Sequence, residues 1–293
     1  MTSITATRTP HGRILSAAWA AILGIFIALF GQGVWSALIA ANLATTPAIP
    51  WAVGVMSVAL WLIWQYLNGR FGPQRTSESR RLRLRANALP ANVFAWALLA
   101  GALSIVALAG WWMLISRLLH ISGSVLPDMS KYPRLTIVPS VAMGTLISPI
   151  LEQAGLWGYC QSILEGEFSG PAAIVSTAIL FALLPHPPIH VVLWPKLILY
   201  FCTGVTFGVM AYLTKSILPG LLVHIFGLLA FFTLVFQNQS AQSGADAWMW
   251  IHAVQTMVFA ALSIAALARL RRLTEPMQRL PTFTNAEQRR PVR

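Results

Sequence analysis

Among the acidic residues of this sequence, Glu152 alone lies well inside a long apolar stretch. The other seven lie in predicted loops, helix ends or the tail: Glu78, Asp128, Glu165, Glu167, Asp246, Glu275 and Glu287. A carboxylate in apolar surroundings costs several kcal/mol unless it faces a cavity or a partner. We therefore predict a functional role for Glu152. The alternative is a carboxylate that fixes helix packing through an interhelical hydrogen bond.

Three histidines, His186, His190 and His224, also lie in or beside apolar stretches. A glutamate with two histidines can act on a water molecule as base, orienting group and oxyanion donor. The same three side chains can instead hold Zn²⁺ and leave one coordination position open. The sequence leaves both the metal and the choice between His186 and His190 open. The remaining histidines lie near termini or predicted membrane interfaces: His11, His120 and His252.

Small residues recur at helical spacing near these ionisable groups. Such residues let helix backbones approach closely in lipid, so we expect close packing around the candidate site. They are Gly144, Ser148 and Gly155 beside Glu152, Gly204 and Gly208 further along, and Gly220 and Gly227 around His224.

The composition indicates an integral membrane protein. Of the 293 residues, 57% are hydrophobic and only 10% are charged, and the mean hydropathy is +0.68. A soluble domain is about one-quarter charged. The net charge of +12 comes from basic clusters that follow long apolar stretches, which is typical of cytoplasmic loops and not of nucleic-acid binding. Cys160 and Cys202 lie in apolar surroundings and predict no disulfide framework.

The apolar runs predict an all-α, polytopic fold of about eight transmembrane helices. We expect helices over residues 15–43, 48–67, 91–119, 135–164, 171–185, 191–213, 217–236 and 247–268. Most of these runs approach or exceed the roughly 20 residues that a bilayer crossing needs. No internal repeat is evident, which argues against an inverted-repeat transporter.

The positions of Lys and Arg predict that both termini lie in the cytoplasm. With that orientation the inner segments hold 16 of these residues and the outer segments hold 3, as the positive-inside rule requires. We expect residues 1–134 to form the first three spans and a basic loop over 68–92 that lies along the lipid surface. Residues 135–268 would form the core with the last helix, and 269–293 a basic tail that is disordered after Leu273.

Three segments, in this order, carry a family resemblance. They are Ser148-Pro-Ile-Leu-Glu-Gln-Ala-Gly-Leu-Trp-Gly158, then Phe181-Ala-Leu-Leu-Pro-His186, then Gly204 and Gly208 followed by Thr214-Lys-Ser216, Pro219 and His224. They resemble Pro-Ile-x-Glu-Glu-x-x-x-Arg-Gly, Phe-x-x-x-His, and Gly-x-x-x-Gly with Thr-Gly-Ser, Pro and His. These are motifs of the CPBP family, the CAAX-prenyl-protease and bacteriocin-processing intramembrane proteases, also called the Abi family.

The resemblance implies an intramembrane endopeptidase in which Glu152 activates a water molecule to attack a peptide bond. It makes His186 a partner in that activation and His224 a stabiliser of the oxyanion or a metal ligand. The expected partners are the lipid bilayer and a membrane-associated peptide or protein, prenylated or not, in a bacterial plasma membrane. Glu152 and His186 can meet in one of two ways. Either the fourth span begins beyond the lipid, or the fifth span begins well inside the cytoplasm.

Several positions depart from the family motifs. Gln153 stands at the second Glu, Trp157 at the Arg, and Leu228 where an Asn is expected four residues after His224; one extra residue separates Phe181 from His186. Losing the Glu and the Arg together can be nearly neutral, because neither charge is left buried alone. Losing an oxyanion donor costs about 3 kcal/mol of barrier. The alternative function is therefore an inactive relative that acts as a membrane binding or immunity protein.

Overall fold

The computed structural model describes residues 10–120, 131–186, 193–231 and 246–279. The regular structure of these residues is entirely helical, which confirms the predicted all-α class. The helices are α1 (Pro10–Thr45), α2 (Trp51–Leu67), the short 3₁₀ turn η1 (Gln74–Thr76), α3 (Ser77–Leu84), α4 (Ala91–Leu118), α5 (Arg134–Glu152), the π-helix η2 (Gln153–Cys160), α6 (Gln161–Glu167), α7 (Gly170–Leu183), α8 (Leu193–Thr214), α9 (Leu218–Ala230) and α10 (Asp246–Arg279).

Each of the eight predicted apolar helices is present, but they differ in length. Five are long and apolar enough to cross a bilayer: α1, α4, the continuous helix Arg134–Glu167 made of α5, η2 and α6, α8, and α10. Of the shorter apolar helices, α2 has 17 residues and α7 has 14. At about 1.5 Å per residue, α7 extends about 21 Å, less than the roughly 30 Å of a hydrocarbon core. The chain is thus an integral membrane protein with spans of unequal length.

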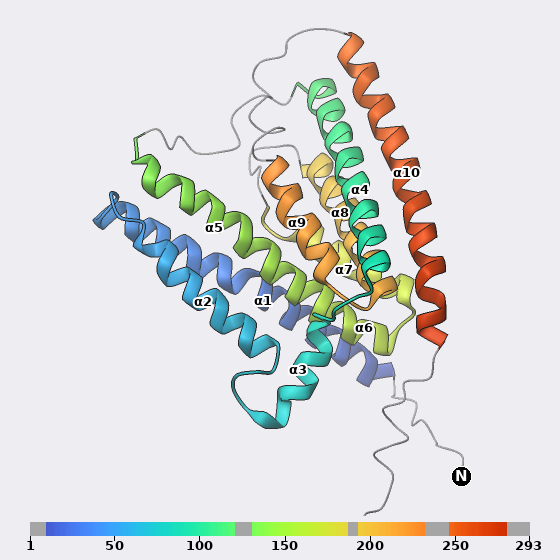
Figure 1. Cartoon of the computed structure of the whole chain (residues 1–293), viewed down its shortest axis with the longest axis horizontal. Helices are drawn as coiled ribbons and strands as arrows, with labels where there is room; N and C mark the ends of the chain where they lie inside the picture. Colours follow the sequence, from blue (N-terminus) through green and yellow to red (C-terminus); the bar gives the residue numbers. More distant parts are fainter. Residues whose placement is uncertain (1–9, 121–130, 187–192, 232–245, 280–293) are drawn as a thin grey trace, which may run out of the picture.

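Two groups of helices meet at the centre of the molecule. Helices α1, α2 and α5 pack against one another and run side by side across the left of the view, whereas α4 and α10 lie along each other on the right (Figure 1). Between them, α7 packs on α8, and α9 packs on both α4 and α5. The helix that carries Glu152 therefore contacts elements from the first and the second half of the chain.

The π-helix η2 begins directly after Glu152 and is buried on all sides. Each of its eight residues is buried, from Gln153 to Cys160. A π-helix turn holds more residues than an α-helical turn, and such turns often occur at functional sites. Pro149 lies inside α5 one turn earlier and cannot donate a backbone hydrogen bond. The regular ladder is therefore interrupted on both sides of Glu152.

Glycines allow α1 to pack directly on η2. A Cβ placed on Gly155 would lie 2.5 Å from the carbonyl oxygen of Gly24 and 3.1 Å from the amide nitrogen of Ala28. No real Cβ fits at such distances, so the two backbones touch where both residues lack side chains. The predicted packing role of Gly155 is thereby explained by a partner in the first helix.

The structure corrects the prediction that residues 68–92 form a basic loop, because part of this segment is helical. Helix α3 lies within this segment, and Arg80 on α3 is buried. The Arg80 guanidinium donates hydrogen bonds to the carbonyl oxygens of Tyr66, Phe71 and Pro73. These contacts satisfy carbonyls at the end of α2 and in the turn after it, which is why an isolated basic run folds here.

The prediction that the tail is disordered after Leu273 was also wrong at its start. Helix α10 continues to Arg279. Leu270 is buried in the main core and Leu273 packs against it. Arg271 and Glu275 form an ion pair at i,i+4 spacing, with Nε and Oε1 3.2 Å apart, which supports a helix. The predicted tail residues 280–293 lie outside the described part of the chain.

Candidate active site

Glu152, His186 and His224 lie together although they come from α5, the segment after α7, and α9. Oε2 of Glu152 is 3.6 Å from Nε2 of His224 and 3.8 Å from Nε2 of His186. Glu152 is fully buried, and the two histidines are 7% and 8% exposed. The three residues that the sequence singled out therefore form one cluster inside the bundle. His190, the alternative to His186, lies outside the described residues.

A helical hairpin brings Glu152 and His186 to the same depth. The continuous helix Arg134–Glu167 turns at Phe168 and Ser169 into α7. Glu152 lies 16 residues before Phe168, about 24 Å along the helix, and His186 lies 17 residues after Ser169, of which α7 supplies about 21 Å. The helix that carries Glu152 has 34 residues and α7 has 14, and where the two spans begin relative to the lipid stays a prediction.

The extra residue before His186 is absorbed by a turn. Helix α7 ends at Leu183, Leu184 is extended, and the backbone N–H of His186 donates to the Leu184 carbonyl over 2.9 Å. The ring Nδ1 of His186 lies 3.0 Å from the same oxygen. Despite the longer spacing, the rings of Phe181 and His186 remain in contact, with centroids 4.6 Å apart. The chain leaves the helix before His186, so helical periodicity no longer decides where this ring lies.

Aromatic rings hold both imidazoles in place. His186 stacks on Tyr200 with centroids 4.0 Å apart and planes at 21°. His224 lies against Phe207 at 4.8 Å and against Phe181 at 6.0 Å. These contacts restrict the rotation of each ring and keep the surroundings apolar. In such surroundings the interaction between a carboxylate and a neighbouring polar group is stronger than in water.

Several polar atoms of the cluster are buried without a hydrogen-bond partner. They are Oε2 of Glu152, Nε2 of His186 and Nδ1 of His224. The separations of 3.6 and 3.8 Å between Oε2 and the imidazoles exceed the length of a hydrogen bond. A small molecule such as water can bridge groups at this spacing, and buried polar groups usually need such a partner. Oε2 of Glu152 and Nε2 of His186 face each other, and Nε2 of His224 faces the same oxygen, so a reacting water would be held beside these three atoms.

The side chains also bear on the question of a metal. Two imidazoles and one carboxylate are a donor set that Zn²⁺ accepts in proteins. Within the described residues, however, no group of three or more His, Cys, Asp or Glu side chains is arranged to hold a metal ion.

Two departures from the family motifs line the site. Trp157 is fully buried, donates its indole N–H to the Gly204 carbonyl over 3.2 Å and lies edge-on to His224 with centroids 6.4 Å apart. The Gln153 side chain lies against Gly220, where an added Cβ would come 3.0 Å from its Oε1. Both residues therefore pack in the core at the start of η2, and Trp157 forms part of the wall around His224.

The turn between α8 and α9 sets the position of His224. Lys215 has a φ of 52°, in the left-handed region where the family motif has Gly and where a side chain is strained. Thr214 Oγ1 donates to the Ser216 carbonyl over 2.9 Å, and Ser216 Oγ donates to the Asn87 carbonyl over 2.7 Å. These bonds hold the turn from which α9 begins.

One site residue was missed by sequence reasoning. Nε2 of Gln32, on α1, lies 2.6 Å from Oε1 of Glu152 and 3.1 Å from Oγ of Ser148. Ser148 was noted only as a small residue, and its hydroxyl also donates to Oε1 of Glu152. The available signal was that Gln32 is the only side-chain amide between residues 14 and 41.

A comparison with protein families decides where this cluster belongs. Residues 134–229 match the family described as Rce1-like, type II CAAX prenyl endopeptidase. These residues form the Rce1-like segment of the chain. The Rce1-like segment runs from the start of α5 almost to the end of α9 and holds Glu152, His186 and His224, which confirms the family that the motifs indicated. No curated protein and no solved structure matches the chain. Gln32 lies outside the Rce1-like segment.

Proposed function

We propose that the protein is an intramembrane endopeptidase in which Glu152 activates a water molecule to cleave a peptide bond. The observation that carries the proposal is the position of Oε2 of Glu152, 3.6 Å and 3.8 Å from the Nε2 atoms of His224 and His186. A base, an orienting group and an oxyanion donor must surround one reacting water, and these separations suit a water that bridges the carboxylate and the imidazoles. The match of residues 134–229 to a peptidase family supports the reaction class.

In the proposed reaction, Oε2 of Glu152 accepts a proton from the water as its oxygen attacks the carbonyl carbon of the peptide bond. The carbonyl oxygen becomes negatively charged, and an N–H of His224 stabilises it with a hydrogen bond. The protonated Glu152 then gives its proton to the leaving nitrogen, and the C–N bond breaks. The products are a carboxylic acid and an amine.

We assign His186 the role of orienting the water. Its Nδ1 lies 3.0 Å from the Leu184 carbonyl, and a carbonyl oxygen can only accept, so Nδ1 carries the hydrogen. In the neutral ring Nε2 is then an acceptor. A water that donates one hydrogen to this Nε2 and the other to Oε2 of Glu152 keeps a lone pair for the attack. The stack on Tyr200 holds the ring in that orientation.

The proposed substrate is a membrane-associated peptide, and the description of the matching family points to prenylated C-terminal sequences. Glu152 is buried in the bundle, about 24 Å along the helix from the turn at Phe168. A peptide reaching it must enter the apolar part of the membrane, which a lipid anchor favours because each buried CH₂ contributes about 0.8 kcal/mol.

The second candidate is an inactive relative that binds a membrane partner or lipidated peptide without cutting it. The observation that favours it is Leu228, an apolar side chain at the position of the family's Asn, one helical turn after His224 on α9. An apolar group cannot donate a hydrogen bond to an oxyanion.

The decisive experiment compares the purified parent with Glu152→Gln on a panel of prenylated and unprenylated membrane peptides. We expect cleavage by the parent and a loss of about 10²- to 10⁴-fold in Glu152→Gln, the usual contribution of a general base. Thermal stability should stay equal or rise, because a buried carboxylate kept for chemistry costs stability. Glu275→Gln, on exposed α10 surface, is the matched control.

Each other result has a distinct meaning. Activity that survives in Glu152→Gln would show that the catalytic residues lie elsewhere. Unfolding of Glu152→Gln in detergent would assign Glu152 to helix packing. A parent that binds but does not cleave any peptide of the panel would support the inactive relative.

A further inference from the structure

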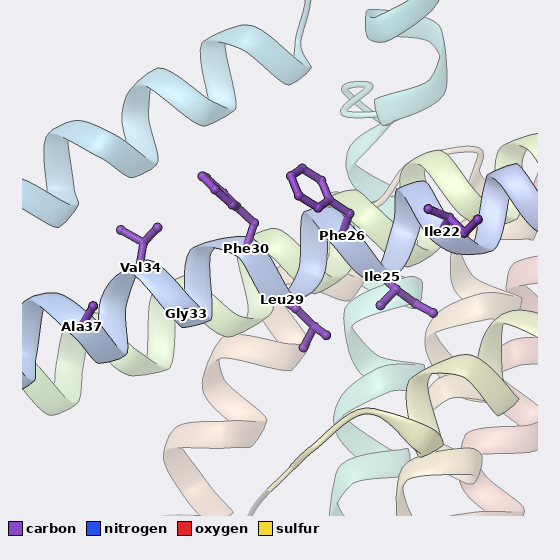
Figure 2. Close-up of a pocket in the computed structure, with 8 residues that line it drawn as sticks. All are labelled: Ile22, Ile25, Phe26, Leu29, Phe30, Gly33, Val34 and Ala37. Atoms are coloured by element: carbon purple, nitrogen blue, oxygen red, sulfur yellow. The ribbon is translucent and has the colours of Figure 1, made fainter.

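Helix α1 has two different faces where it passes the candidate active site. Its outward face is apolar, with Ile22, Phe26 and Phe30 projecting away from the bundle around a groove of about 780 Å³ (Figure 2). On the bundle side, Gly24 meets Gly155, and a Cβ on Gly31 would overlap the side chain of Leu151. These glycines bring α1 close enough to α5 for a side chain of α1 to reach Glu152.

That side chain is Gln32, the residue after Gly31. Its Nε2 donates to Oε1 of Glu152 over 2.6 Å and to Oγ of Ser148 over 3.1 Å. Ser148 in turn donates its hydroxyl hydrogen to the same Oε1. The amide must present its NH₂ group here, because its carbonyl oxygen would face a carboxylate oxygen. The three side chains thus form a closed ring of hydrogen bonds.

The two carboxylate oxygens of Glu152 therefore differ in their hydrogen bonding. Oε1 accepts from Gln32 and Ser148, which occupies its lone pairs. Oε2 is buried without a hydrogen-bond partner and faces both imidazoles. Because the carboxylate is planar, holding Oε1 also fixes the direction of Oε2. Rotation of the carboxylate would require breaking two hydrogen bonds to a charged group.

We propose that Gln32 is a positioning residue of the active site: it holds Oε1 of Glu152 so that Oε2 is the oxygen that meets the water. This inference rests on the proposed peptidase function. It assigns a part of the site to α1, which precedes the segment 134–229 that matches the family. That segment supplies the cluster of Glu152 and the histidines, and the first helix of the chain supplies the group that orients the carboxylate.

The first test is the kinetics of Gln32→Leu, which keeps the size of the side chain and removes the donor. We expect kcat to fall about tenfold to a hundredfold, the scale of one hydrogen bond to a charged group, while KM changes less than about threefold. Gln255→Leu is the matched control, because Gln255 also donates across helices, to the Val106 carbonyl over 3.0 Å, away from Glu152. Its kcat should equal that of the parent.

Ser148→Ala removes the other donor to Oε1. We expect Gln32→Leu with Ser148→Ala to lower kcat more than either change alone, because the carboxylate can then rotate. A Gln32→Leu variant with the kcat of the parent would overturn the inference while cleavage by the parent upheld the proposed function. A higher KM with an unchanged kcat would also overturn the inference, because Gln32 would then affect only substrate binding.

The second test does not require activity. The unfolding temperature in detergent is measured for Gln32→Leu in the parent and in a Glu152→Met background, where the acceptor is gone. We expect Gln32→Leu to lower the unfolding temperature in the parent and to have little effect beside Met, because the interaction is already lost. Equal shifts in both backgrounds would overturn the inference. If the parent cleaves nothing but the shifts are coupled, the proposed function fails and Gln32 still holds the carboxylate.

Discussion

The guanidinium of Arg85 binds both carboxylate oxygens of Glu165, at 2.9 and 2.8 Å, although 80 residues separate them. Lys215 reaches the same carboxylate from the turn before α9, with Nζ 2.9 Å from Oε2. The backbone carbonyl of Arg85 also accepts a hydrogen bond from the N–H of Ile217 over 3.0 Å. The segment before α4, the end of the helix that carries Glu152, and the start of the helix that carries His224 are therefore joined at one carboxylate.

This ion cluster predicts unequal effects of removing its members. Glu165→Gln should lower the free energy of unfolding by about 3 kcal/mol, because Arg85 would keep a largely buried charge without its partner. Lys215→Met should cost less than about 1 kcal/mol, since the Lys215 side chain is 45% exposed and such pairs are weak. Unfolding of both variants in detergent by heat checks the order. Equal losses would contradict the assignment of Arg85 as the principal partner.

The contact between α1 and η2 predicts that two glycines of the same helix respond in opposite ways. A Cβ on Gly24 would lie 2.7 Å from Cβ of Cys160, whereas nothing lies within 4 Å of a Cβ on Gly33. We expect Gly24→Ala to cost about 1–3 kcal/mol through overpacking. Gly33→Ala should be neutral or stabilise by up to about 1 kcal/mol, because Ala is the better helix former. Thermal unfolding of the two variants measures the difference, and equal effects would show that α1 does not pack here.

A substitution at Leu228 distinguishes a slow peptidase from an inactive relative. If the enzyme lacks one oxyanion donor, Leu228→Asn should raise turnover by roughly one to two orders of magnitude, the scale of one restored donor. In an inactive relative the change should add no cleavage and weaken partner binding through an unpaired amide. The assay compares the parent, Leu228→Asn and a Glu152→Gln control. An active parent that Leu228→Asn does not accelerate would show that Leu228 does not border the reacting carbonyl.

We expect that replacing Gln153 alone by the Glu of the family motif destabilises the protein. Gln153 is 1% exposed, so Gln153→Glu would bury a second carboxylate beside Glu152. We expect this variant to lose about 3–5 kcal/mol of stability, the usual cost of a buried charge without a partner. Adding Trp157→Arg should recover part of that loss, because the two residues lie one turn apart. Thermal unfolding of both single variants and the double variant tests the coupling, and additive losses would contradict it.

The sequence alone determined the membrane class and the eight apolar helices, and it singled out Glu152, His186 and His224 as candidate site residues. These features are local: a helix in lipid needs a long apolar run to satisfy its backbone, and an ionisable residue in such a run is conspicuous because it is costly. Ordered motifs then indicated the family. The domain boundaries and the cytoplasmic placement of the termini stay predictions.

The tertiary structure alone decided which atoms meet. Arg80 in helix 77–84 binds carbonyls of residues 7 to 14 positions earlier, and Leu270 at the end of α10 is buried in the main core, contacts that the hydropathy pattern does not show. The turn at Leu184 decides the position of His186, because the chain there has left helical periodicity. Gln32 became a partner of Glu152 only because Gly24 and Gly155 let two helices touch. A hydrogen bond between residues 120 positions apart depends on how those helices cross, and helix crossing is set by packing in three dimensions.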